Sequence, residues 1–437
     1  MLTQTTLSAL GFATVFIFLF LIMTKRLSVT VSLIVVPILA AVVGGFATQM
    51  GPMLLNGIRG VAPVGIMIMF AILYFGLMLE VGLFDPLVKK LLKIVKGDPL
   101  KAVLGTAFLT VAVALDGDGA TTFMITISTM LPLYDRLGMS RLVLSGTICL
   151  AAGVMNIIPW GGPTARAMTT LHADSLAIFN PVIPAMLVGL VWVFFVAYLF
   201  GKRERARLGI KDLSLDDEQP LTPEQAALRR PKLLWFNIIL TVVLVVALIQ
   251  AILPLPILFM IAYAIALPVN FPKPKDQMDR IVAQGQNVML VCSMIFAAGV
   301  FTGILNGTKM ITAMAKTMVA IIPDPLTPFL PVIVAITSMP ASLIFTPDAY
   351  YFGILPILAQ TATALGIDPL SIGRAAILGQ MTTGFPLSPL TASTFILVGM
   401  SGVDLGDHQR NIFWWAFGST AVMTVVALLT GAIPLMK

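Results

Sequence analysis

The chain has 437 residues, of which 58% are hydrophobic and only 11% are charged. A soluble domain of average composition carries about 25% charged residues, so these proportions exclude an ordinary soluble protein and predict a multi-pass protein of the cell membrane. The net charge of +7 does not indicate a nucleic-acid partner, because the basic residues gather in loops between apolar runs, where they set membrane topology.

The first half of the chain, residues 1–200, is predicted to be one structural repeat. Spans are expected at 7–23, 28–47, 61–80 and 181–200, each near the length that a membrane helix needs. Residues 101–134 contain two apolar arms of about 15 residues, too short to cross at 1.5 Å per residue. We therefore predict a re-entrant hairpin, followed by a long span at 140–172 that proline and glycine interrupt.

Residues 201–232 hold the longest hydrophilic stretch and are predicted to be a cytoplasmic linker. The second half, residues 233–437, repeats the plan of the first. Its spans are expected at 233–253, 255–270, 284–305 and 411–434, with a hairpin at 326–366 and a broken span at 370–400. Each half makes an odd number of crossings, so the halves have opposite orientations. The predicted fold class is an all-α integral membrane protein with an inverted-topology repeat, each half having five spans, one re-entrant hairpin and one broken helix.

Two further patterns support this arrangement. The order of landmarks after each hairpin centre is the same, with Leu-Gly at 137–138 and 365–366, proline at 159 and 386, and Thr-Ala at 164–165 and 391–392. With the N-terminus outside, 21 of the 27 Lys and Arg residues fall on the cytoplasmic side, five fall on the other side, and Arg166 lies within the membrane. This excess is the one that the positive-inside rule requires.

The centres of the two predicted hairpins carry acids. The first reads Asp116-Gly117-Asp118-Gly119-Ala-Thr121-Thr122, and the second reads Thr346-Pro-Asp348-Ala-Tyr350. Acids at membrane depth are costly unless they bind a cation or a proton. The free N–H groups that start the following arm favour an anion. The structural alternatives are an ordinary Asp-Gly turn for the first centre and a helix N-cap for Asp348.

The two broken spans supply the other candidates. The first break reads Asn156-Ile-Ile-Pro159-Trp160-Gly161-Gly162-Pro163-Thr164-Ala-Arg166, and the second includes Ser388 and Thr391. Helix cannot persist through these residues, and the freed carbonyls and N–H groups must face a cavity or a ligand. Arg166 is suited to bind a carboxylate through two parallel hydrogen bonds. A structural ion pair of Arg166 with Asp116 or Asp118 is the alternative, and the two roles are compatible.

Four motifs resemble those of the citrate–metal–proton symporter family, and the likeness covers essentially the whole chain. They lie at residues 115–123, 153–166, 346–353 and 406–410. The resemblance implies uptake of citrate complexed with a divalent cation such as Mg²⁺ or Ca²⁺, coupled to protons, with the metal as part of the substrate and no separate cofactor. More distantly, the hairpin centres look like those of the divalent-anion sodium symporters, which carry Ser-Asn-Thr there. That superfamily implies a homodimer in lipid, with hairpins and broken helices that move against a static scaffold.

We therefore expect a transporter rather than an enzyme. Asp116, Asp118 and Asp348 are assigned to the metal or the coupled protons, and Arg166 to a substrate carboxylate. The other candidates for substrate binding are Thr121, Thr122, Asn156, Gly161, Gly162, Thr164, Thr346, Tyr350, Ser388 and Thr391. A proton symporter of free di- or tricarboxylates or sugar acids is the second hypothesis. An intramembrane enzyme with paired acids and a channel are the remaining alternatives. His172 and His408 lie near loop ends and are expected to be solvated.

Overall fold

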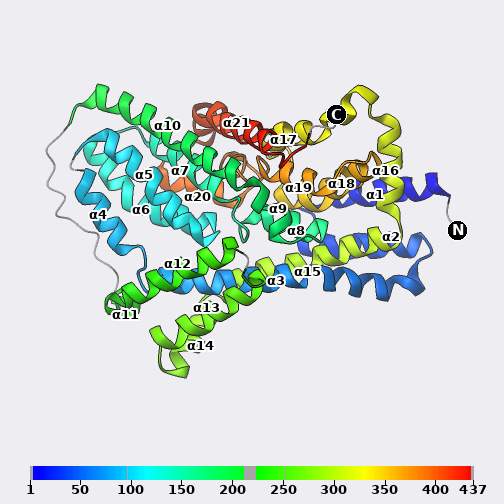
Figure 1. Ribbon diagram of the computed structural model, residues 1–437, viewed down its shortest axis with the longest axis horizontal. Helices are drawn as coiled ribbons and strands as arrows, with labels where there is room; N and C mark the ends of the chain where they lie inside the picture. The colour runs from blue at the N-terminus through cyan, green and yellow to red at the C-terminus, as the bar shows by residue number, and fades with distance from the viewer. Residues whose placement is uncertain (1–2, 96, 211–222, 251, 435–437) are drawn as a thin grey trace.

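The computed structural model describes residues 3–95, 97–210, 223–250 and 252–434, and every regular element in these residues is helical (Figure 1). Seven helices of the described chain are long and apolar enough to cross a membrane unaided: Gln4–Met23, Ala47–Glu80, Pro99–Asp116, Ser175–Leu208, Ala226–Gln250, Gly285–Gly307 and Leu405–Leu429. The prediction of an all-α membrane protein is confirmed. Residues 211–222 of the predicted linker lie outside the described residues.

The helices of the first half follow the predicted order. They are α1 (Gln4–Met23), α2 (Val29–Val43), α3 (Met50–Glu80), α4 (Asp85–Val95), α5 (Pro99–Val113), η2 (Ala114–Asp116), α6 (Gly119–Leu137), α7 (Arg141–Met155), α8 (Gly162–Leu171), α9 (Ser175–Ile178) and α10 (Ile183–Leu208). Helix α3 starts earlier than the expected residue 61, because neighbouring helices in a membrane tolerate the internal Pro63. The two arms of the hairpin have 18 and 19 residues, longer than expected, and the expectation that both are too short to cross a membrane is wrong for the first arm, which is long and apolar enough. Asp98 caps the first arm, and the second continues to Gly138.

Both arms of this hairpin return to the same end of the molecule. Asp98 at the start of α5 pairs with Arg205 near the end of α10, with Nε–Oδ1 at 2.8 Å. Arg207, two residues further along α10, donates to the carbonyl of Gly138, which ends α6, at 3.1 Å. The start of α5 and the end of α6 therefore both contact the last turns of α10, and the chain reverses direction at the centre between them.

The described part of the predicted linker contains the short helix α11 (Pro223–Leu228). The helices of the second half are α12 (Leu234–Gln250), α13 (Leu255–Asn270), α14 (Pro274–Ala283), α15 (Gly285–Gly307), α16 (Met310–Ile321), α17 (Leu330–Ala341), the π-helical turn η6 (Ala349–Ile354), α18 (Leu355–Ala364), α19 (Pro369–Ile377), η7 (Phe385–Leu387), α20 (Ala392–Ser401) and α21 (Leu405–Leu429). Helix α21 begins before the expected residue 411, because Asp404 caps it by accepting from the N–H groups of Gly406 and Asp407.

Contacts between helices repeat in the two halves. Helix α3 packs along α15, α2 packs on α15, and α13 packs on α3 in the mirror arrangement. Helices α5 and α6 both contact α7, as α17 and α18 both contact α19. The α3–α15 crossing needs glycine, since a Cβ on Gly57 would lie 2.0 Å from the carbonyl oxygen of Gly299. In Figure 1, α2, α3, α12, α13 and α15 form one side of the molecule, and the first hairpin, α7, α10, α20 and α21 form the other.

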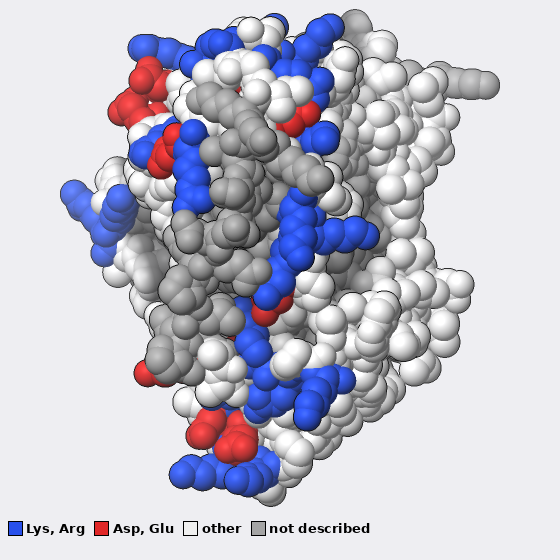
Figure 2. Space-filling model, turned by 90° about the vertical axis from the view of Figure 1, so that its left-hand side faces the viewer, with Lys and Arg blue, Asp and Glu red and all other residues white. Residues whose placement is uncertain are grey.

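Basic side chains mark one end of the molecule. This end carries the last turns of α10 together with α4, α11 and α14, and Figure 2 shows Lys and Arg spread across it. It corresponds to the side predicted to be cytoplasmic. Glu80 at the end of α3 pairs with Arg280 of α14 at 3.2 Å. The end of α3 and the start of α15, which follows α14, therefore lie toward this side.

Candidate functional site

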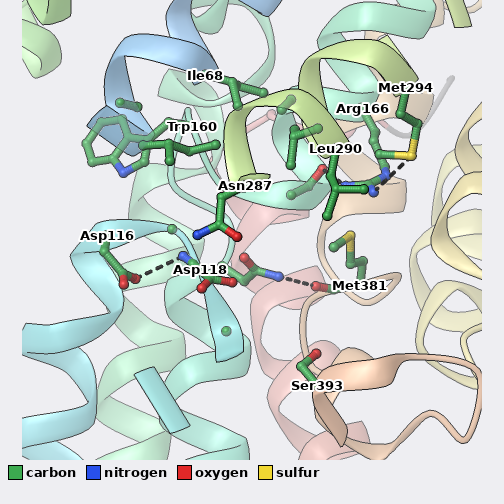
Figure 3. Close-up of a pocket in the computed structure, with 18 of the residues that line it drawn as sticks. Ile68, Asp116, Asp118, Trp160, Arg166, Asn287, Leu290, Met294, Met381 and Ser393 are labelled. Carbon is green, nitrogen blue, oxygen red and sulfur yellow. Dashed lines mark hydrogen bonds between the residues drawn. The ribbon is translucent and has the colours of Figure 1, made fainter. Parts of the chain in front are cut away.

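A cavity of about 250 Å³ lies where the first hairpin centre and both helix breaks meet α3 and α15 (Figure 3). Its charged and polar side chains are Asp116, Asp118, Asn156, Arg166, Asn287, Thr391 and Ser393. Helices α3 and α15 add apolar walls that include Ile68, Ile72 and Leu290. Both halves of the repeat therefore contribute to one small site.

The first hairpin centre presents a buried acid to this cavity. Gly117 has φ +77, a left-handed conformation that glycine adopts without strain. The turn lets the Asp118 N–H donate to Oδ1 of Asp116 at 2.9 Å, and the Thr122 hydroxyl donates to the same oxygen at 3.3 Å. Asp116 is only 7% exposed, and its Oδ2 has no hydrogen-bond partner among the described residues. A buried carboxylate oxygen in this state is costly, so Asp116 is suited to bind a cation or a proton.

Asp118 combines a structural contact with access to the cavity. Its carboxylate caps α6 by accepting from the N–H groups of Ala120 and Thr121 at 3.2 and 3.1 Å, and from the Thr121 hydroxyl at 2.5 Å. The side chain is nevertheless exposed and lines the cavity. Figure 3 shows the amide of Asn287 pointing toward Asp116 and Asp118. Carboxylate and amide oxygens are ligands that Mg²⁺ and Ca²⁺ prefer.

Arg166 stands apart from these acids and pairs with Asp348 of the second hairpin. Its Nε donates to Oδ1 of Asp348 at 2.7 Å, and the two side chains are 13% and 14% exposed. Its Nη1 donates to the carbonyl of Gly162 at 3.2 Å. The alternative that Arg166 pairs with Asp116 or Asp118 is wrong, because η6 packs directly on α8 and brings Asp348 to the guanidinium first.

The three predicted acids do not form a single cluster. Asp116 and Asp118 both line the cavity, whereas Asp348 does not. No group of three His, Cys, Asp or Glu side chains within the described part of the chain is placed to hold a metal ion. Two carboxylates at the first hairpin centre and one paired carboxylate at the second are the arrangement that the fold provides.

Six of the predicted residues line the cavity: Asp116, Asp118, Asn156, Gly162, Arg166 and Thr391. The others lie behind its walls, and most of them support the local chain. The Thr164 hydroxyl donates to the carbonyl of Ile157, and the Ser388 hydroxyl to that of Ser342. Thr346 accepts from the N–H of Ala349, Tyr350 is buried, and Gly161 allows a turn in which a Cβ would meet the Asn156 carbonyl oxygen at 2.1 Å. Thr121 and Thr122 contact the acids as described above.

Sequence reasoning missed two polar lining residues, Asn287 and Ser393. Ser393 takes the mirror position of Arg166, because each follows the aligned threonine, Thr391 or Thr164, by two positions. The repeat was therefore a usable signal. Asn287 is one of three amides at the start of an apolar span, with Gln284 and Gln286 beside it, so the sequence offered no signal that singled it out.

The expectation for His408 was also wrong. The side chain is fully buried, with Nδ1 at 3.0 Å from the Ser145 hydroxyl and Nε2 at 3.2 Å from the carbonyl of Pro386. The early start of α21 places His408 in the first turns of the helix, where it packs on the second break instead of facing solvent.

An all-helical membrane fold in which one hairpin centre and two broken helices meet at a small cavity is the architecture of a membrane transporter. The sequence profile of the citrate transporter family matches residues 18–379, and the chain belongs to this family. The family resemblance seen in the motifs is confirmed. The chain is therefore a transporter rather than an enzyme, and a multi-pass protein of the cell membrane.

Relatives and solved structures agree with this assignment. The chain is 56% identical to the citrate transporter of Bacillus subtilis (strain 168) over 98% of its length and 99% of the relative. It is 49% identical to the Mg(2+)/citrate complex secondary transporter of the same organism, with the same coverage. The fold matches the YdaH transporter of Alcanivorax borkumensis with a TM-score of 0.56 over 88% of both chains. It matches MtrF of Neisseria gonorrhoeae with a TM-score of 0.57 over 89% of this chain and 85% of that one. Both structures are 14% identical in sequence, so they show the fold alone.

Proposed function

We propose that the protein is a secondary transporter that carries citrate complexed with a divalent cation, of the Mg²⁺ or Ca²⁺ type, in symport with protons. The observation that carries this proposal is one cavity lined by two acids and an arginine, Asp116, Asp118 and Arg166. A cavity with both signs of charge fits a cargo that contains both a metal ion and free carboxylates. The 49% identity to a relative named as a Mg(2+)/citrate complex transporter supports the same cargo.

Charge favours the complex over free citrate. Citrate carries three negative charges at neutral pH, and moving them into a site of low dielectric is costly. A bound divalent cation reduces the charge to −1, which Arg166 and the N–H groups at the start of α6 balance more easily. A proton symporter of free carboxylates or sugar acids would have to balance more negative charge beside Asp116 and Asp118.

The residues take separate roles in this proposal. Asp116 and Asp118 bind the metal ion, and the unpaired Oδ2 of Asp116 is its first ligand. Arg166 binds a citrate carboxylate, and Asn156, Asn287, Thr391 and Ser393 offer hydrogen bonds to the rest of the cargo. Asp348 is left for the coupled proton, because it is held by Arg166 outside the cavity.

The transport movement is proposed to follow from the repeat. Residues 1–200 and 233–437 form the two repeats, joined by the cytoplasmic linker 201–232. The re-entrant hairpins and broken helices move as one body against α3, α15 and their neighbours, in a homodimer surrounded by lipid. The cavity reaches residues 287–295 of α15, the part of that helix toward the basic end. We therefore assign the structure to an inward-facing state.

The test is uptake of radiolabelled citrate into proteoliposomes with each divalent ion and an imposed pH gradient. Asp118→Asn should abolish metal-dependent citrate entry, and the fold should survive because asparagine caps helices as well as aspartate. The matched control is Asp135→Asn, in α6 outside the cavity, where the acid pairs with the exposed Arg141 at 2.9 Å. Normal uptake by Asp118→Asn would refute the assignment. Uptake that persists in a chelator would favour the free-carboxylate symporter instead.

A further inference from the structure

The Arg166–Asp348 pair joins the two halves of the repeat at the edge of the cavity. Arg166 lines the cavity, and its Nε holds Asp348 at 2.7 Å on the side away from it. Its Nη2 is matched, among the described residues, only by the sulfur of Met294 at 3.8 Å, a weak acceptor (Figure 3). Nε of the guanidinium thus holds the internal carboxylate of Asp348. Nη2 lies beside Met294, which lines the cavity, and has no oxygen partner among the described residues.

The geometry of this pair leaves room for exchange. A guanidinium binds a carboxylate best through two parallel N–H···O bonds. Asp348 receives a single bond from Nε, while Nη1 is used by the carbonyl of Gly162. A carboxylate that enters from the cavity and takes Nη2 and a second nitrogen would gain the better geometry. The internal carboxylate and the cargo therefore compete for the same cation.

We propose that Asp348 couples proton uptake to cargo binding by releasing Arg166. This inference rests on the proposed function and specifies its coupling step. In the empty site, the Asp348 carboxylate neutralises Arg166. When a cargo carboxylate displaces it, Arg166 keeps its charge and turns to the cargo, and Asp348 takes one proton from a hydronium ion to become a neutral acid. One O–H bond forms on the carboxyl, one O–H bond of hydronium breaks to leave water, and one proton enters with each cargo.

Among the described helices that pack around Asp348, none offers a second cation in place of Arg166. Helix α8 contributes Arg166 as its one charged residue, and η6 itself adds the phenols of Tyr350 and Tyr351. The other helices packed on η6 are α1, α15 and α18, and they contain no charged residue. Cys292 is the one titratable group in these three, and its sulfur lies 3.6 Å from the carbonyl of Gly65. A carboxylate at membrane depth that loses its one cation is stabilised by taking up a proton.

The experiment measures Mg²⁺–citrate binding to the purified full-length protein by calorimetry between pH 6 and pH 8. For the native chain, cargo binding takes up one proton, so the Kd should rise by up to about tenfold for each unit by which the pH increases. This rise comes in addition to the change due to citrate's own ionisation. Asp348→Asn should lose this extra pH dependence and keep the low-pH affinity at high pH. In proteoliposomes, this variant should still exchange internal for external citrate, but a pH gradient should no longer drive accumulation. Asp135→Asn, a surface acid also paired with arginine, should behave as the native chain.

The outcomes separate this inference from the proposed function. If Asp348→Asn keeps both the native pH dependence of the Kd and gradient-driven accumulation, the inference is overturned and metal–citrate transport stands. If the native chain itself neither binds nor accumulates Mg²⁺–citrate, the proposed function fails first. If Asp348→Asn does not fold, Asp348→Glu provides the test. This variant keeps a carboxyl group but at a different distance from Arg166, so the pH at which the Kd changes should shift. An unshifted pH profile of the Kd would overturn the inference.

Discussion

The two contacts between a hairpin centre and a helix break are mirror images in sequence but differ in structure. At one, the second hairpin centre meets the first break, and the ion pair of Asp348 and Arg166 closes the contact. At the other, the first hairpin centre meets the second break through the stacked rings of Phe123 and Phe385, 5.7 Å apart, and Asp118 and Ser393 line the cavity beside them. Inverted topology thus does not impose equal geometry. We call the first the closed contact, because an ion pair joins its two sides, and the second the open contact, because its polar side chains Asp118 and Ser393 face the cavity.

Removal of Arg166 should have the largest effect, because the closed contact depends on its charge and the proposed function assigns it to the cargo as well. Arg166→Gln would leave Asp348 in a mostly buried position without a cation and would remove the partner of the cargo carboxylate. Loss of one member of a buried charged pair costs about 3–5 kcal/mol, so citrate uptake should fall by about 100- to 5000-fold. Initial rates in proteoliposomes, normalised to protein incorporated, measure this loss. Arg141→Gln, at an exposed pair, is the control, and a loss of less than about threefold for Arg166→Gln would contradict the role of the closed contact.

A smaller effect should follow from weakening the attachment of the first hairpin, which carries the open contact. Burial alone would raise the pKa of Asp98, but hydrogen bonds from Arg205 and the Leu100 N–H outweigh it and hold this pKa below the ordinary value. The stabilisation is therefore complete above the ordinary pKa of about 4 and is lost as the pH falls through the lower folded value. Asp98→Asn should lower the thermal unfolding midpoint by about 2–4 °C at pH 7.5.

The pH profile distinguishes this ion pair from a packing effect. The difference in unfolding midpoint between Asp98→Asn and the native chain should begin to shrink below about pH 4, where the unfolded chain takes up the proton. It should disappear only when the pH falls below the lower folded pKa, where the native carboxyl is protonated as well. Thermal unfolding in detergent across this range gives the comparison. A difference that is constant from neutral to acid pH would mean that the charge of Asp98 does not hold the hairpin to α10.

The positions of the hairpin centres and helix breaks could be predicted from the sequence. Proline and glycine interrupt apolar runs at these points, and no other arrangement of the backbone satisfies its polar groups in a membrane. Helix α7 ends at Met155 and α8 starts at Gly162, within the break expected from Pro159 and the glycines. The acids at the centres were also visible, because charged residues are rare in such a sequence.

The pairing of side chains across the repeat could not be predicted. Arg166 and Asp348 are 182 residues apart, and nothing in their spacing says whether the first or the second hairpin centre reaches α8. Asn287 faces the cavity only because α15 packs along α3 with that face inward. His408 was misjudged for the same reason, since its burial depends on contacts with Ser145 and Pro386 from distant segments.

The smallest effect is expected at Ser393, and it tests whether the two contacts are truly unequal. Ser393 occupies the mirror position of Arg166 and lines the cavity, but its hydroxyl is neutral. A neutral hydrogen bond contributes about 1 kcal/mol, so Ser393→Ala should raise the KM for citrate by no more than about fivefold and leave the pH dependence of uptake unchanged. Concentration series at two pH values measure both quantities. A loss as large as that of Arg166→Gln would show that the open contact also depends on the residue at this position. The difference between the two contacts would then reflect the conformation that this structure shows rather than the side chains of the two halves.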